Sequence, residues 1–196
     1  MSPVRQAQPS GTRGFTLIEL LVSLSVMAIV LSLAAPPFMN LLAANRISTQ
    51  TNEFVAALNL ARSEAVRRSQ AVTLRSADDD NYALGFTVFP DANADGSAAG
   101  ATNTTDGLPI RENNAFAGNT TVKRVTRSAA PAPFTYTTST DAARMHLVFS
   151  GRGAIETTLP AFFKICDSGN TAINGRVVQV NVVGKITLDS VNEPCS

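Results

Sequence analysis

The 196-residue chain contains no tryptophan, one histidine and two cysteines. This shortage leaves little for metal-binding or general acid–base chemistry, and the two cysteines lack zinc or redox spacing. His146 lies in the alternating run MHLVFS, which predicts that Leu147 and Phe149 point inward and His146 outward. No carboxylate pair or nucleophile has the sequence context of a catalytic site. We therefore expect neither cofactor nor enzyme activity, although an exported enzyme on a membrane stalk is the alternative.

An excess of charge is also missing, because 16 Lys and Arg residues stand against 15 Asp and Glu residues. Such a balance argues against nucleic-acid binding by overall charge, but it allows a local basic patch. Charge is absent altogether from residues 20–45. Within the apolar run, Phe15 to Ala35 would span about 30 Å as a helix, the thickness of a bilayer core. The run is therefore a candidate membrane segment.

Residues 13–38 read RGFTLIELLVSLSVMAIVLSLAAPPF, with basic residues before the apolar run and none closely after it. By the positive-inside rule, the N-terminus is cytoplasmic and the rest of the chain is exported. An ordinary secretory signal peptide, cleaved after Ala35, is the alternative interpretation. That alternative explains neither the Gly14–Phe15 junction nor the acid at Glu19.

The leader that ends at Gly14, the Phe15 that follows and the lone acid Glu19 resemble the class III signal of type IV prepilins and pseudopilins. The resemblance implies that prepilin peptidase cleaves between Gly14 and Phe15 and methylates the new amine of Phe15. It also implies that Glu19 pairs with the amine of a neighbouring subunit in a filament, which offsets part of the cost of burying the carboxylate. An acid that snorkels to the membrane face is the alternative.

Pro36 is expected to break or loosen the helix, or alternatively to end it. Residues 38–70 regain helical periodicity, and one apolar stripe predicts a face that packs on a sheet. The stripe consists of Ile47, Thr51, Phe54, Leu58, Ala61 and Ala65. The phrase FVAALNLARSEAVRRSQAVTL at residues 54–74 resembles GspH/FimT-type minor pilins and pseudopilins, in which such a helix end runs into the first strand.

These features predict an α+β fold of the type IV pilin-like class, with a long N-terminal helix packed on an antiparallel β-sheet or small β-sandwich. The expected segments are a leader at 1–14, a transmembrane half-helix at 15–37, an amphipathic half-helix at 38–70 and a periplasmic β-rich domain at 71–196. Strands are predicted at 71–75, 82–89, 108–112, 120–126, 133–138, 145–150, 154–158, 161–166, 176–183 and 185–189.

The segment 91–107 is predicted to be a loop, and it begins like a calcium-binding loop with Asp91, Asn93 and Asp95. That motif needs a bidentate acid at its twelfth position, where this chain has Thr102. Asp and Asn beside Gly are also favoured in tight turns. The pattern therefore favours a turn, with calcium as the alternative.

Cys166 and Cys195 are expected to form a disulfide because a lone pair of cysteines in an exported domain usually bridges. The bridge would close a loop of about 30 residues and contribute roughly 3.5 kcal/mol in the chain-entropy model. A C-terminal disulfide loop is also common in the type IV pilins that the leader resembles. Free thiols are the alternative.

The resemblance implies a minor pilin or pseudopilin that joins other pilins in a filament at the bacterial inner membrane. A type IV pilus is favoured, and a type II secretion pseudopilus is the alternative. Some FimT-type pilins bind DNA through a C-terminal motif resembling Gly-Arg-x-Arg, and the corresponding residues 184–187 read GKIT. Solvated strand charge is the alternative to DNA binding. The candidate DNA-binding residues are Arg176, Lys185, Lys123, Arg124 and Arg127.

Overall fold

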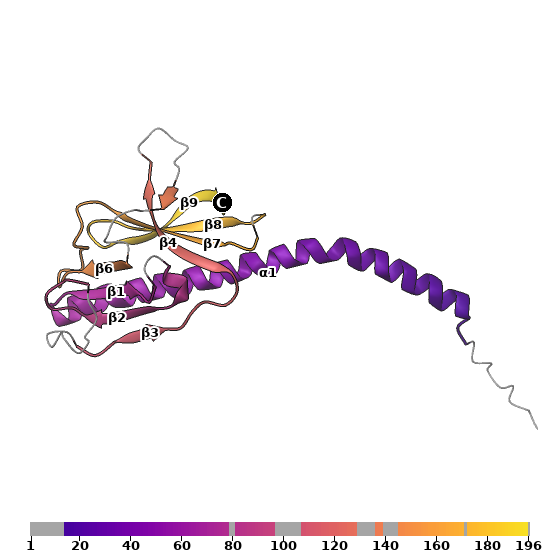
Figure 1. The fold of residues 1–196 in the computed structure, drawn as a ribbon, viewed down its shortest axis with the longest axis horizontal. Coiled ribbons are helices and arrows are strands. Elements are labelled where there is room, and N and C mark those ends of the chain that lie inside the picture. The colour runs from indigo at the N-terminus through magenta and orange to yellow at the C-terminus, as the bar shows by residue number, and fades with distance from the viewer. Residues whose placement is uncertain are drawn as a thin grey trace, which may run out of the picture. The chain divides into compact units, whose positions relative to one another are not determined.

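The structure is a computed structural model that describes residues 14–78, 81–96, 107–128, 136–138, 145–170 and 172–195. The chain divides into two compact units, residues 1–39 and residues 40–196. Helix α1 (Leu17–Arg68) supplies residues to both units, and all strands belong to the second (Figure 1).

Pro36 and Pro37 lie inside α1, which is continuous through both. The predicted helix break at Pro36 is therefore wrong, and so is the alternative that the helix ends there. Each proline removes one backbone donor, but its fixed φ of about −65° is itself helical. The loss stays within one turn, and the helix formers on either side continue the helix.

The second unit holds two antiparallel sheets. The first has the order β3-β2-β1-β6 and consists of β1 (Val72–Ser76), β2 (Phe86–Pro90), β3 (Arg111–Asn113) and β6 (His146–Phe149). The second has the order β5-β4-β7-β8-β9 and consists of β4 (Thr120–Arg127), β5 (Tyr136–Thr138), β7 (Ala161–Asp167), β8 (Asn174–Val180) and β9 (Ile186–Pro194). A short 3₁₀ helix, η1 (Tyr82–Leu84), connects β1 to β2.

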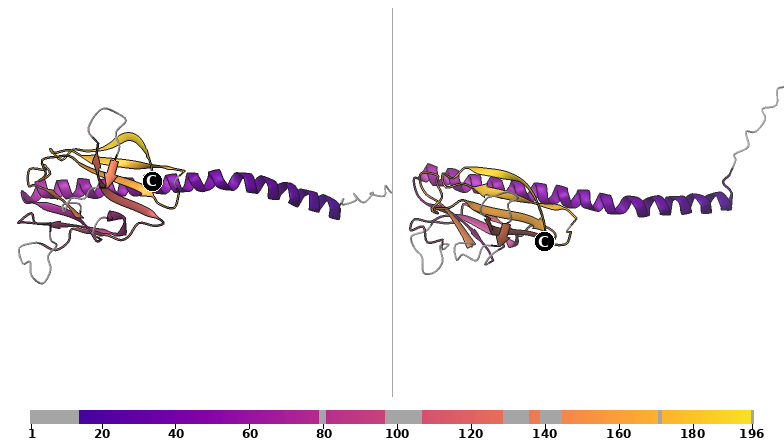
Figure 2. Two further views of the ribbon diagram at one scale, coloured as in Figure 1. Left: turned by 45° about the horizontal axis from the view of Figure 1, so that its top comes forward. Right: turned by 90° about the horizontal axis from the view of Figure 1, so that it is seen from above.

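The main core lies between the C-terminal half of α1 and the inner faces of both sheets (Figure 2). Every residue of the predicted apolar stripe of α1 is buried, so that prediction is confirmed. Phe54 lies at its centre, with its ring 5.6 Å from Tyr82, 5.6 Å from Phe86 and 5.1 Å from Phe163. All three contacts are edge-to-face, the arrangement that aromatic quadrupoles favour.

Polar contacts also join α1 to the sheets. Arg46 forms an ion pair with Asp167 at the end of β7. Further along the helix, Thr120 of β4 donates a 2.6 Å hydrogen bond to the side chain of Gln50. These contacts satisfy buried polar groups beside the apolar core.

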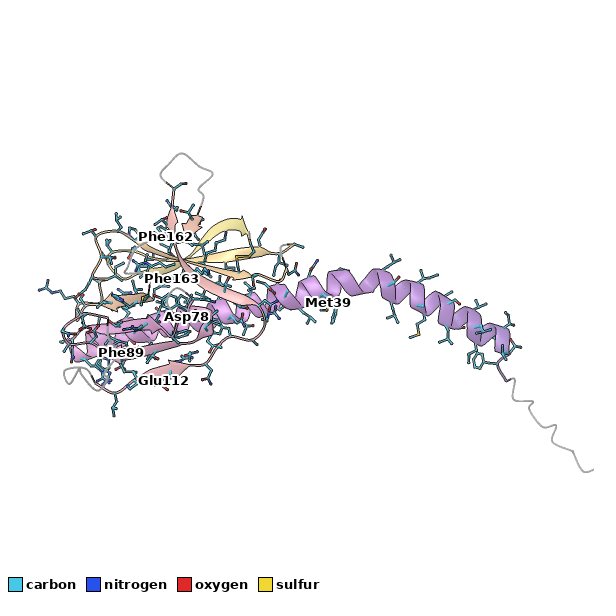
Figure 3. The ribbon with its side chains drawn as sticks, viewed as in Figure 1. Met39, Asp78, Phe89, Glu112, Phe162 and Phe163 are labelled. Carbon is cyan, nitrogen blue, oxygen red and sulfur yellow. A yellow bond between two sulfur atoms is a disulfide. The ribbon has the colours of Figure 1, made fainter. Side chains whose placement is uncertain are left out.

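A second, smaller cluster lies on the other face of the five-stranded sheet and contains Val125, Tyr136, Phe162 and Val177. Phe162 and Phe163 are consecutive on β7 and therefore serve different clusters (Figure 3). Tyr136 Oη donates a 2.6 Å hydrogen bond to Asp189 Oδ2. Because β5 and β9 are opposite edges of the sheet, this bond shows that the sheet curls over the cluster.

Three predicted strands need correction. The segment 82–89 begins with η1 instead, because the Asn81 side chain accepts from Ala83 N and Gly85 ends the turn at a φ of 120°. The segment 154–158 is not a strand: only Ile155 forms an isolated bridge, after a turn at Ser150–Gly153. The strand predicted at 176–183 stops at Val180, where a turn closed by Gly184 begins.

The expected disulfide between Cys166 and Cys195 is present. Cys166 lies in β7 and Cys195 follows β9, so the bridge fastens the C-terminal end of the chain across β8. Gly175 of β8 packs on the bridge: a Cβ there would lie 2.5 Å from Cys166 Sγ and 3.0 Å from Cys195 Sγ. A side chain at this position is therefore excluded by the sulfur atoms.

Replacing Phe54 by alanine should reduce the free energy of unfolding of residues 40–196 by about 3–5 kcal/mol, because it removes the ring that three aromatic partners share. Asn52, which is exposed on α1, provides the matched control, and Asn52→Ala should stay within about 0.5 kcal/mol. Urea unfolding followed by circular dichroism measures both. Equal losses in the two variants would contradict the central role of Phe54.

Candidate functional site

Among the described residues, those of the N-terminal part of α1 present an exposed apolar surface. Its most apolar window of 18 residues has a mean hydropathy of 2.4 and is 0% buried. By length and composition this helix can cross a membrane. An apolar surface of this extent marks a membrane or protein interface.

The start of α1 is held by a reciprocal pair of hydrogen bonds. Glu19 N donates to Thr16 Oγ1 over 3.2 Å, and Thr16 N donates toward Glu19 Oε2 over 3.5 Å. This is a capping box, in which the two side chains satisfy backbone donors that the first helical turn leaves unpaired. Thr-x-x-Glu before an apolar run is the sequence signature of this motif, so the capping role of Thr16 could have been predicted from residues 16–19.

The junction between Gly14 and Phe15 directly precedes the cap. Phe15 is 84% exposed, and no atom lies within 4 Å of the position that a Gly14 Cβ would take. The structure therefore places the predicted cleavage point, the lone acid and the helix start together in an accessible segment.

The predicted turn at Asp91–Asp95 uses its oxygen atoms internally. Asp91 is buried and accepts hydrogen bonds from Thr73 Oγ1 at 2.6 Å, Gly96 N at 2.9 Å and Asp95 N at 3.2 Å. Asn93 Nδ2 donates to Asp95 Oδ2. Across the described part of the chain, no group of three or more His, Cys, Asp or Glu residues could hold a metal ion. Thr102 lies outside the described residues.

Two candidate DNA-binding arginines make contacts inside the domain. Arg127 Nη1 lies 3.4 Å from Asp189 Oδ2, and its guanidinium lies 5.4 Å from the centre of the Phe162 ring. Arg124 Nη1 donates to the carbonyl of His146 over 3.3 Å. Both side chains therefore support the fold, and sequence patterns could not reveal these long-range partners.

The other candidates are distributed over the five-stranded sheet. Lys123 of β4 pairs across strands with Lys164 of β7. Arg176 is exposed on β8, which β7 separates from β4. Lys185 is exposed beyond the turn that follows β8, where its backbone N donates to Asn181 Oδ1. The structure does not gather the five predicted residues into one patch.

A groove of about 620 Å³ opens at the end of β4, where Arg124 and Arg127 face the segment 156–160. Its lining contains neither histidine nor cysteine nor serine. The lining does include one carboxylate, Glu156, and three threonine hydroxyls.

Burial raises the pKa of Tyr136 to about 12, and the neighbouring Asp189 carboxylate acts in the same direction. Burial also raises the pKa of Tyr82, which lies in the main core. Both phenols therefore stay protonated well above the ordinary value of about 10.

Comparison with known proteins gives two family matches. The model of type II transport protein GspH matches residues 50–184, and the prokaryotic N-terminal methylation motif matches residues 9–35. No curated protein sequence shows significant similarity to the chain.

Solved structures of similar fold were also found. A crystal structure of the type IV minor pilin FimU of Pseudomonas aeruginosa is 26% identical, with a TM-score of 0.56, over 74% of this chain and 90% of that one. A second FimU crystal form is 25% identical, with a TM-score of 0.51, over 72% and 91%. The minor pseudopilin EpsH of the Vibrio cholerae type 2 secretion system is 14% identical, with a TM-score of 0.45, over 74% and 96%.

Titration of the chain's two tyrosines tests the Tyr136–Asp189 contact. Because its folded pKa is raised, Tyr136 contributes stability that is present below pH 10 and is lost as the pH rises through about 12. Asp189→Asn should lower the Tyr136 pKa, since it removes the carboxylate that stabilises the neutral phenol. Phenolate absorbance measures the titration, and Tyr136→Phe identifies its share. An unchanged titration in Asp189→Asn would refute the contact.

Proposed function

Because this chain belongs to the GspH family of minor pilins and pseudopilins, we propose that it is a minor pilin that joins a type IV pilus and supports its assembly. The observation that carries the proposal is the exposed apolar segment of α1, which has no charge at residues 20–45, follows the capping acid Glu19 and matches the N-terminal methylation motif. A filament subunit needs such a helix first as a membrane anchor and then as a packing surface.

The proposed processing begins with cleavage between Gly14 and Phe15 by prepilin peptidase. The methylation-motif match over residues 9–35 and the exposure of Phe15 support this step. Cleavage leaves a free α-amino group on Phe15, which the peptidase then methylates. Methylation keeps the positive charge of the amine, so the group can still pair with a carboxylate.

Glu19 is the proposed partner of that amine on an adjacent subunit. An isolated acid in the centre of a membrane helix costs about 2.5–3.5 kcal/mol, and pairing with a cation offsets part of this cost. Each subunit would pair its amine with one neighbour and its carboxylate with another neighbour, so the contact is head-to-tail. Repetition of such a contact generates an open helical filament.

The proposed location is the bacterial inner membrane, with the N-terminus in the cytoplasm and residues 71–196 in the periplasm. The Cys166–Cys195 disulfide supports an exported domain, because disulfides persist in oxidising compartments. After assembly the subunit would leave the bilayer and join the filament.

A pseudopilus of type II secretion is the second candidate, favoured by the description of the matching family model as a type II transport protein. The similarity to FimU, at 26% identity and a TM-score of 0.56, favours the pilus. Filament fractions from strains that lack either the pilus platform or the secretion platform distinguish the two. Loss of the subunit only without the pilus platform supports the first proposal.

Processing predicts the mass of the mature protein. The chain purified from native membranes should lack residues 1–14 and carry one added methyl group on Phe15. Gly14→Leu should retain the leader, while Gly11→Leu, which changes a glycine before the junction, should not. Intact-mass and N-terminal peptide spectrometry measure these outcomes. A native chain that keeps residues 1–14, or begins beyond the apolar segment, would contradict the processing step.

Glu19→Val should insert into the membrane normally but reach the filament at a level lowered more than about tenfold, because losing one partner of a buried ion pair costs roughly 3–5 kcal/mol. Glu112, an exposed acid of β3, supplies the matched control Glu112→Gln. Immunoblots of sheared filaments and of membranes quantify both variants. Normal filament levels in Glu19→Val would reject the proposed pairing.

A further inference from the structure

The single histidine of the chain lies under a loop. His146 is on the outer face of β6 as expected, because Leu147 and Phe149 are buried in the main core. This face is not open, however, and His146 is only partly exposed. Gly96 packs on the imidazole: a Cβ there would lie 2.5 Å from His146 Cγ.

The sheet surface around His146 is largely buried. Its cross-strand partner on β1 is Arg75, and the next pair on the same face is Thr73 with Val148. Phe89 of β2 pairs with Thr73 and is 0% exposed. These residues point away from α1, so segments other than the helix must cover them.

Residues 91–96 form the described cover, which we call the latch. Asp91 connects the latch to β1 through Thr73 Oγ1 and closes it through Gly96 N. Arg75 Nη1 donates a 2.8 Å hydrogen bond to the carbonyl of Gly96. Gly96 has a φ of 75°, which glycine adopts without strain, so the turn can place its backbone directly on the ring.

Charged groups face His146 from three elements. Arg75 on β1 and Arg124 on β4 are cations, whereas Asp91 and Asp95 in the latch are anions. Burial lowers the pKa of His146, both arginines lower it further, and the two aspartates oppose them. The imidazole under the closed latch is thus disposed to remain neutral.

We propose that residues 91–96 are a pH-operated latch, closed over neutral His146 and released when mild acid protonates the imidazole. Protonation adds a third positive charge near Arg75 and Arg124 at a partly desolvated position. Opening the latch lets water solvate that charge. It also uncovers the part of the outer sheet face that contains Thr73 and Val148.

The direction of the pH effect follows from linkage. Opening removes the burial that is the largest cause of the lowered pKa of His146, so the open state holds this pKa closer to its ordinary value of about 6.5 than the closed state does. The closed latch is therefore fully stable above about pH 6.5. Its stability declines as the pH falls from there through the pKa of the closed state.

Nuclear magnetic resonance of the full-length chain in detergent micelles tests the proposal. The lone histidine gives one ring titration, and the amide of Gly96, which donates to Asp91, reports closure through its hydrogen-exchange protection. We expect His146 to titrate below pH 6.5 and the protection of Gly96, corrected for intrinsic exchange, to fall about fivefold or more between pH 7 and pH 5.

Three variants separate the latch from other titrating groups. His146→Gln should keep the protection of Gly96 equal at the two pH values. Arg124→Gln should raise the pKa of His146 and reduce the loss of protection, which provides an independent test if His146→Gln does not fold. Arg176→Gln removes an exposed charge on β8 and should change neither observable.

The proposal is overturned if His146 titrates at pH 6.5 or above, or if protection falls equally in acid in His146→Gln. It is also overturned if Arg124→Gln leaves the pKa of His146 unchanged. None of these outcomes bears on processing at Gly14 or on filament incorporation, so the latch and the proposed function are tested separately.

Discussion

The apolar surface at the start of α1 is the constraint on which the rest of the molecule depends. From Leu17 to Leu33 the large apolar side chains are all exposed in the isolated chain. Burial of apolar surface is favourable by about 25 cal/mol per Å², so this segment cannot remain in water. Only a bilayer or a bundle of similar helices removes it from water. The folded domain leaves this requirement unmet, because its core uses only the later stripe of the helix.

Glu19 distinguishes these two environments. In the isolated chain its carboxylate caps the helix through Thr16, a contact worth about 1 kcal/mol. Inside a filament a neighbouring amine would offer a charge–charge contact in a desolvated setting, where loss of one partner costs roughly 3–5 kcal/mol. Burying the carboxylate without a partner would therefore cost more than the cap contributes, which is why the proposed filament needs the amine beside Glu19. An apolar residue at this position could form neither the capping hydrogen bond nor the ion pair.

The helix and its buried stripe followed from the sequence because their signal is local. Phe54 and Leu58 lie at helical spacing on one face of α1, and the sheets pack against that face. The 3₁₀ turn at Tyr82–Leu84 was missed because β-propensity outweighed the cap at Asn81. A helix break was predicted at Pro36 because proline lacks the backbone N–H that donates a helical hydrogen bond. That rule does not consider the stability of the helical turns on either side.

The residues whose predicted roles changed most are those that contact distant segments of the chain. Arg127 looked available for DNA, yet the curl of the sheet brings Asp189 from the opposite edge to its guanidinium. His146 was correctly assigned to the outer face, but only the fold shows that Gly96 lies on its ring. Side chains alternate in direction along β1, so Leu74 points into the main core while Thr73 and Arg75 point toward the latch. In the proposed latch, protonation of His146 acts mainly on Thr73 and Arg75 at the outer face, so the packing of α1 on the inner face can persist while the latch opens.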